Sequence, residues 1–234
     1  MDAKHLSKRM QAVADLVPKV EKLADIGSDH AYLPAYLLNN QVIDFAIAGE
    51  VVKGPFENAV SEIEDQNLTG KMEARLGDGL EVIKKQEAMN VITIAGMGGE
   101  LITSILDEGQ TKLNQNTILI LQPNVDENTL RKWLVNHHFK ITAEKIVLDS
   151  SHFYEMFKAE YTDDQIDYSQ VELDFGPFLV LEQSETFKAK WQAKLEKNKF
   201  ILNKLENSNL KPSEKIKRVK NKIIEIEEVL NGKS

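Results

Sequence analysis

The stretch that decides the fold is "KLADIGSDHAYLPAYLL", residues 22–38. An apolar run ends at Asp25, and Gly27 follows at the turn, as in a strand that leads into a phosphate-binding loop. A nucleotide-binding fingerprint would have glycines at the next two places, where this chain has Asp29 and Ala31. Because those glycines let a pyrophosphate approach the first helix, we predict a strand–turn–helix unit that binds a different ligand.

Strand and helix patterns alternate after this start. The runs that predict strands are short, rich in β-branched residues and typical of strands buried on both faces: KLADIG, VIDFAIAGE, KMEARLG, NVITIAG and NTILILQPN. Helical patterns occupy 31–39, 53–66, 79–88, 98–108 and 126–138, and another, roughly 7–17, precedes the first strand. Such alternation predicts an α/β fold with a doubly wound parallel sheet.

The sheet is predicted to end in a hairpin. FKITAEKIVLD and SHFYEMFKAEY follow one another with no helical pattern between them. A mostly parallel sheet that finishes in this way has an antiparallel last strand. We assign the first domain to residues 1–161.

The tail has a different pattern, and we assign residues 162–234 to a second domain whose boundary lies within 162–185. Two helical stripes of apolar residues occur there: Phe187, Trp191, Leu195, Leu202 and Leu205, interrupted at Asn198, and then Ile216, Val219, Ile223, Ile226 and Leu230. The second stripe has heptad spacing, and Pro212 suits the first turn of its helix. Together they predict an antiparallel helical hairpin, a short coiled coil.

Charge is unevenly distributed between these domains. The net charge is −8, yet from Glu185 onward 13 Lys and Arg stand against 7 Asp and Glu, whereas the rest of the chain has 16 against 30. The asymmetry indicates two parts with different partners, although a solvated lysine-rich helix would account for it equally well.

Composition excludes several classes of protein. The absence of cysteine excludes disulfides and thiolate chemistry, and the five histidines have no metal-ligand spacing, so we expect no metal. No apolar run approaches the ~20 residues of a membrane span, and MDAKHLSKRM has no apolar signal core. We therefore expect a cytoplasmic protein without a membrane partner.

Acidic residues follow three successive strands, at the edge where a doubly wound sheet binds its ligand. Asp25 and Asp29 follow the first strand, Glu50 the second and Asp78 the third. Glu50 could accept hydrogen bonds from ribose hydroxyls, and Asp78 from an adenine amino group. Each acid alone could be a helix cap or a solvated loop residue. Their occurrence at consecutive strand ends favours an adenosine site.

The negative charge discriminates between adenosine cofactors. Dinucleotide phosphates would face Asp29, and like charges near contact cost several kcal/mol at low effective dielectric. S-adenosylmethionine has no phosphate, and its sulfonium and ammonium are positive. The acids therefore predict S-adenosylmethionine as the cofactor. The small residues of AGMGG, 95–99, would let it approach the backbone closely.

Four motifs resemble a known family: DIGSDHAYLP, AGEVVKGPFENA, LGDGL and IAGMGGELI are similar to the bacterial tRNA (adenine-N1) methyltransferases of the TrmK type, which modify adenine 22. The resemblance covers nearly the whole chain. It implies a class I (Rossmann-like) methyltransferase fold for 1–161, S-adenosylmethionine as donor and tRNA as acceptor. It also suggests that 162–234 contacts tRNA.

The resemblance implies cofactor contacts by Asp25, Gly27, Ser28, Asp29, Glu50, Val51, Asp78, Gly79, Gly96 and Met97. Our first catalytic candidate is Asp29, followed by His30, Tyr32 and Asn58. Since the body of the protein is acidic, we expect phosphate contacts mainly in the tail, at Lys188, Lys190, Lys194, Lys197, Lys215, Lys217, Arg218 and Lys222.

The fourth motif lacks the Asn/Asp-Pro-Pro-aromatic sequence of amino-methylating enzymes, which suits methylation of a ring nitrogen instead. Other acceptors remain open: another RNA, a small molecule, or none, as in a non-enzymatic nucleotide-binding adaptor. The chain could be a monomer or a homodimer, and its hairpin could clamp tRNA or mediate dimerisation.

Overall fold

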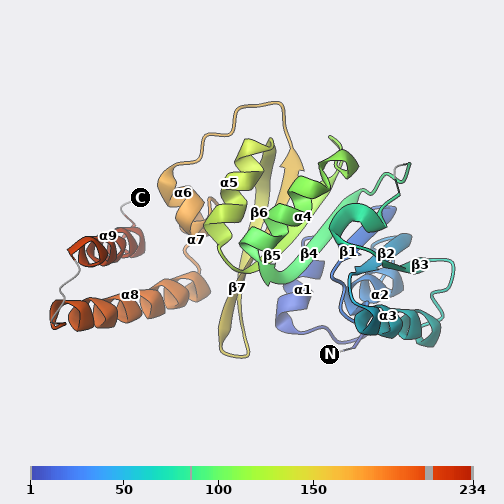
Figure 1. Cartoon of the computed structure of the whole chain (residues 1–234), viewed down its shortest axis with the longest axis horizontal. Coiled ribbons are helices and arrows are strands. Elements are labelled where there is room, and N and C mark those ends of the chain that lie inside the picture. Colours follow the sequence, from blue (N-terminus) through green and yellow to red (C-terminus); the bar gives the residue numbers. More distant parts are fainter. Residues whose placement is uncertain (1, 85, 209–212, 233–234) are drawn as a thin grey trace. The chain divides into compact units, whose positions relative to one another are not determined.

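The computed structural model describes residues 2–84, 86–208 and 213–232. The chain divides into two compact units, Met1–Asp167 and Tyr168–Ser234 (Figure 1). Pro212, expected at the start of the last helix, lies outside the described residues. No helix of the described part is long and apolar enough to cross a membrane, and no group of three or more potential ligands there could hold a metal ion.

A seven-stranded sheet forms the first unit (Figure 1). Its strands are β1 (Lys22–Ile26), β2 (Phe45–Glu50), β3 (Met72–Leu76), β4 (Val91–Gly98), β5 (Ile118–Val125), β6 (Phe139–Asp149) and β7 (His152–Tyr161). They lie in the order β3-β2-β1-β4-β5-β7-β6. Strands β1 to β5 pair in parallel, and β7 lies antiparallel between β5 and β6. The predicted mostly parallel sheet with an antiparallel last strand is confirmed, and this strand lies one place inside the edge that β6 forms.

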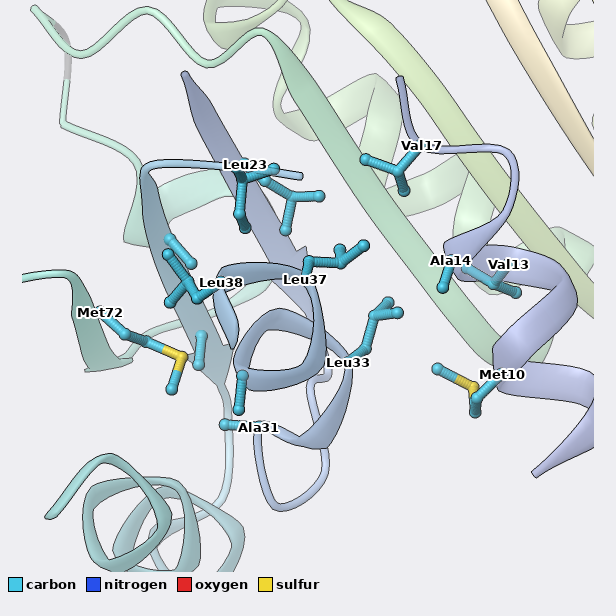
Figure 2. Packing of buried hydrophobic residues seen from close by; sticks show 14 of the residues in the cluster. Met10, Val13, Ala14, Val17, Leu23, Ala31, Leu33, Leu37, Leu38 and Met72 are labelled. Atoms are coloured by element: carbon cyan, nitrogen blue, oxygen red, sulfur yellow. The ribbon is translucent and has the colours of Figure 1, made fainter. Parts of the chain in front are cut away.

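Helices cover both faces of this sheet. One face packs against α1 (Lys8–Ala14), α2 (Tyr32–Asn39) and α3 (Lys53–Asp65), and the other against α4 (Gly99–Glu108) and α5 (Glu127–Asn136). Buried residues of the strands alternate between the two faces, as the pleat requires. On the first face, Met10 of α1 and Leu33 of α2 lie between their helices (Figure 2), so α1 packs beside α2.

The predicted helix at 79–88 is wrong. Among the described residues of this segment, the one helical element is a 3₁₀ turn, η1 (Gly79–Val82), and Ile83 is already extended. Side chains take the backbone groups that a helix would use: Lys112 donates to the Ile83 carbonyl, and Glu87 accepts from the Lys84 N–H at 2.9 Å. Arg75 binds the same Glu87 carboxylate at 2.6 Å. Tertiary contacts thus override the local helical pattern.

Other boundaries differ by a few residues. The helix expected at 7–17 ends at Ala14, and Ser7 is its N-cap and accepts from the Met10 N–H at 3.2 Å. Strand β3 is not buried on both faces, because it lies at the edge of the sheet.

The second unit contains α6 (Gln170–Phe175), α7 (Leu179–Glu182), α8 (Glu185–Glu206) and α9 (Ser213–Leu230). Two ion pairs fix the relative direction of α8 and α9: Lys199 contacts Glu227 at 2.9 Å, and Glu206 contacts Lys220 at 2.8 Å. A step forward along α8 therefore corresponds to a step back along α9, and the helices form an antiparallel hairpin (Figure 1). A continuous coiled-coil seam remains a prediction, because on α9 burial is confined to Ile223, Ile226 and Val229.

Candidate cofactor and acceptor site

A cavity of about 280 Å³ opens at the carboxyl ends of β1, β4 and β5. The order of the sheet reverses between β1 and β4, which is where doubly wound sheets bind ligands. The cavity brings together seven of the predicted site residues: Asp25, Gly27, Ser28, Asp29, Tyr32, Gly96 and Met97. It is also lined by Arg9, Asn124 and Tyr154, which were not predicted.

Asp25 is the buried anchor of the turn after β1. Only 3% of it is exposed, and its two carboxylate oxygens accept from the hydroxyls of Ser28 at 2.6 Å and Thr93 at 2.5 Å. Burial raises the pKa of Asp25, while these two hydrogen bonds lower it. The carboxylate therefore holds the turn in place from below and contributes negative polarity to the floor of the cavity.

The turn after β1 is held in an uncommon conformation. Gly27 has φ +69°, and three non-glycine residues follow in the left-handed region: Asp29 at +41°, His30 at +67° and Ala31 at +56°. Such residues cost of order 1–3 kcal/mol each and persist only where neighbouring contacts enforce them. One contact of this kind is the Asp29 N–H, which donates to Glu50 Oε1 at 2.5 Å.

Gly27 is also required for space. A Cβ at this position would lie 2.2 Å from the Met97 Cε, so the backbone of the turn and the Met97 side chain touch only because the position carries no side chain. The first glycine of the motif thus brings the ends of β1 and β4 together.

Asp29 projects its side chain into solvent at the cavity mouth, with 76% of it exposed. Its Oδ1 lies 3.6 Å from His30 Nε2, and the His30 ring stacks on Tyr32 with centroids 5.2 Å apart. The N-cap of α2 is Ala31, without any side-chain cap hydrogen bond. Neither Asp25 nor Asp29 caps this helix, so that alternative is wrong.

The remaining predicted residues lie outside the cavity lining. Glu50 is 6% exposed at the end of β2; burial raises its pKa, and the Asp29 N–H lowers it. Val51 is 63% exposed, and Asp78 is exposed at the start of η1 without a side-chain cap hydrogen bond. Gly79 follows Asp78 with φ +47°. Asn58 is exposed on α3 and is not brought to the cavity.

Among the predicted phosphate contacts of the second unit, Lys190 is wrong. It is only 4% exposed, and its ammonium lies 5.4 Å from the Trp191 ring centroid. Position 190 lies on the same buried side of α8 as Phe187 and Trp191, so its charge faces the interior of the unit. Lys222 is half-buried and pairs with Asp174 at 3.1 Å and Glu225 at 3.0 Å. The other predicted residues are exposed: Lys188, Lys194, Lys197, Lys215, Lys217 and Arg218.

The strand order, with β7 inserted antiparallel between β5 and β6, and the acid-lined turn after β1 define the class: this is a class I, Rossmann-like methyltransferase fold. A family model described as "tRNA (adenine(22)-N(1))-methyltransferase" matches residues 23–228. The chain belongs to this family, TrmK.

Known proteins of the same kind are similar along nearly the whole chain. The tRNA (adenine(22)-N(1))-methyltransferase of Bacillus subtilis is 42% identical over 212 residues, which cover 89% of each protein. A Streptococcus pneumoniae protein crystallised with S-adenosyl-L-methionine is 43% identical, with a TM-score of 0.88 over 97% of this chain and 100% of that one. The TrmK of M. capricolum, in complex with S-adenosyl-homocysteine, is 27% identical, with a TM-score of 0.87 over 98% and 99%.

Proposed function

We propose that this chain transfers a methyl group from S-adenosylmethionine to N1 of adenine 22 in tRNA. The observation that carries the proposal is the family match over residues 23–228, because it includes the motifs at the ends of β1 to β4. The activity printed for the B. subtilis relative and the cofactor complexes of the two similar structures support it. Such a protein works on tRNA in the cytoplasm.

The residues present fit S-adenosylmethionine. The missing Cβ of Gly27 lets Met97 pack against the turn at the cavity, and the buried carboxylate of Asp25 favours a positively charged ligand there. Asp25, Gly27 and Ser28 would hold its methionine end. The residues after β2 and β3, Glu50, Val51, Asp78 and Gly79, would hold its ribose and adenine, and Gly96 and Met97 would form the wall towards the acceptor.

The bound donor supplies an electrophilic methyl group on a sulfonium. Adenine N1 is neutral at pH 7 and has a lone pair in the ring plane, so no residue needs to remove a proton before the new N–C bond forms. The protein would contribute position and charge stabilisation. The Asp29 carboxylate would accept a hydrogen bond from the 6-amino group and stabilise the positive charge that the base acquires.

The base must leave its stack to reach the cavity. Tyr32, stacked on His30, would pack against the face of the extruded adenine, and Met97 lines the same cavity. His30 and Tyr32 would then act by positioning the base, and Asn58 has no assigned part in this step.

We assign catalysis to residues 1–161 and tRNA contact to residues 162–234. The second unit supports this division by its charge, since the exposed cations Lys188, Lys194, Lys197, Lys215, Lys217 and Arg218 lie there. Lys222 would contribute to this field while remaining paired with Asp174.

The deciding experiment incubates the protein with labelled S-adenosylmethionine and unmodified tRNA and identifies the methylated nucleoside. We expect N1-methyladenosine, and a tRNA with guanosine at position 22 should remain unlabelled. Label in a different nucleoside, or none, would overturn the proposal. Label on a small molecule from a cell extract would identify a different acceptor class.

A further inference from the structure

We propose that Arg9 is an oxyanion receptor in the cavity at the carboxyl ends of β1, β4 and β5. The inference rests on the proposed function for the identity of its ligands. Arg9 belongs to α1, before the first strand, and is assigned no role by the motifs of the family resemblance. Its guanidinium nevertheless lines the same cavity as Asp25 and Asp29.

Contacts along the whole residue position the guanidinium. The Arg9 N–H donates to Asp149 Oδ2 at 3.0 Å, which fixes the backbone of α1 to the end of β6. Met10, the next residue, is buried between α1 and α2 (Figure 2). The guanidinium carbon lies 5.3 Å from the centroid of the Tyr154 ring, within range of a cation–π interaction.

The side-chain amide of Gln122 also holds the Arg9 guanidinium. It is fully buried in β5, and its Oε1 accepts from Arg9 Nη1 at 2.7 Å and from the Gly96 N–H at 3.1 Å. Its Nε2 donates to the Pro123 carbonyl at 2.8 Å and to Asn124 Oδ1 at 3.1 Å. Asn124 in turn donates to the Gly96 carbonyl at 2.7 Å. The amide therefore has a fixed orientation, and one edge of the guanidinium is fixed with it.

Gly96 provides the space for this arrangement. It has φ +81°, and a Cβ there would lie 3.0 Å from Arg9 Nη1. The lack of a side chain at Gly96 therefore leaves space for the Arg9 guanidinium and for a ligand that approaches the backbone at the end of β4.

The charge of Arg9 has no ion-pair partner among the residues that the structure describes. Within residues 2–84, 86–208 and 213–232, no carboxylate lies within 4.0 Å of its guanidinium, whereas Arg75 and Arg131 each pair with two glutamates. An arginine without an ion pair, half-buried in a cavity and held at one edge, presents its remaining N–H donors to a ligand. Oxyanions bind such a planar fork through parallel, charge-assisted hydrogen bonds.

Two oxyanions would enter this cavity: the α-carboxylate of the donor and a phosphate beside the extruded adenosine. They share one chemistry, and two binding measurements separate them. The first compares S-adenosylhomocysteine with S-adenosyl-3-thiopropylamine, which lacks only the carboxylate. The second measures tRNA affinity as a function of salt.

Both measurements use Arg9→Gln, with Arg9→Lys as the conservative variant and Lys8→Gln as the matched control. Lys8 is the exposed neighbour on α1, so its replacement removes the same charge outside the cavity. If the ligand is the carboxylate, Arg9→Gln should weaken S-adenosylhomocysteine by about tenfold or more and leave the thiopropylamine unchanged. If the ligand is a phosphate, both small ligands should bind normally, while tRNA binding weakens and its salt slope falls by about 0.7–0.9. In either case Arg9→Lys should retain part of the affinity and Lys8→Gln most of it.

Two results would overturn the proposal. One is unchanged affinity of Arg9→Gln for all three ligands. The other is an equal loss for both small ligands with a lower melting temperature, which would mean that Arg9 only stabilises the fold. The small-ligand comparison needs no methyl transfer. A protein that discriminates them through Arg9 but methylates no tRNA would refute the proposed function and leave this inference standing.

Discussion

The cavity of the first unit and the helical hairpin of the second differ in how they hold charge. Asp25 of the cavity lining and Gln122, which supports Arg9 of that lining, are buried, and each of their side-chain oxygens has a hydrogen-bonded partner. On the hairpin, cations such as Lys215 and Arg218 are exposed on α9. A small ligand whose reacting atom must be placed accurately requires the first arrangement. A polyanionic backbone requires only the second, because its contribution to affinity is sequence-independent and electrostatic.

The largest effect should come from Gly27→Val, which changes the turn that lines the cavity of the first unit. Valine would have to adopt the φ of +69° that Gly27 has, which is unfavourable for a β-branched residue, and its side chain would collide with Met97 Cε. We expect S-adenosylhomocysteine affinity to fall by about a hundredfold or more, measured by calorimetry. Gly54→Ala is the control, since a Cβ there meets nothing within 4 Å. Normal affinity in Gly27→Val would show that the turn is not a ligand cradle.

Asp29→Ala should separate binding from chemistry. Its exposed carboxylate is proposed to act on the base, so methyl transfer should fall by about a hundredfold while S-adenosylhomocysteine affinity changes little. Single-turnover rates and calorimetry measure the two quantities. Asp44→Ala removes an exposed acid before β2, away from the cavity, and should change neither. Equal losses in rate and affinity would assign Asp29 to the donor alone.

The double variant Lys215→Ala/Arg218→Ala tests the exposed cations of the helical hairpin. It should weaken tRNA binding about tenfold and reduce the salt slope by about 1.4–1.8, with donor affinity intact. Lys71→Ala/Lys140→Ala removes two exposed cations from the first unit and should have a smaller effect. Unchanged tRNA binding in the α9 variant would favour the hairpin as a dimerisation element. Analytical ultracentrifugation would then determine whether the variant is a monomer or a dimer.

The smallest effect concerns pH. Burial raises the pKa of Asp25 above its usual value of 3.8, so the folded state binds more protons than the unfolded state between these two pKa values. In that window the free energy of unfolding should decrease as pH rises, by up to about 1.4 kcal/mol per pH unit. Asp25→Asn should lose this component of the slope, whatever its absolute stability. Urea unfolding between pH 4 and 8 measures both slopes, and parallel curves would contradict the assignment.

The sequence was sufficient for the parts of the molecule whose physics is local. Alternation of strands and helices predicted the sheet, and the acids after β1 and β2 were found because strand ends converge at one edge. The residues that were missed depend on contacts between distant segments. Arg9 reaches the cavity only because α1 packs beside α2, and nothing in its own helix distinguishes it from Lys8. Gln122 belongs to the strand that was predicted, but its hydrogen bonds join β4 to α1.

The errors have the same origin. The 79–88 segment has a helical pattern, but Arg75 and Lys112 bind the carbonyls of Val82 and Ile83, which a helix would use. Lys190 was grouped with its exposed neighbours because lysine is usually solvated, although the spacing from Phe187 places it on the buried side of α8.

The two ion pairs between α8 and α9 also define how the hairpin could change in length. Lys199 and Glu206 are seven residues apart on one helix, as are Lys220 and Glu227 on the other. Inserting seven residues into each helix would lengthen the hairpin by about 10 Å. The same faces of α8 and α9 would then still pack against each other, because seven residues are nearly two full turns. Inserting two would rotate the apolar sides apart. The length of the hairpin could therefore change in two-turn increments without changing how α8 faces α9.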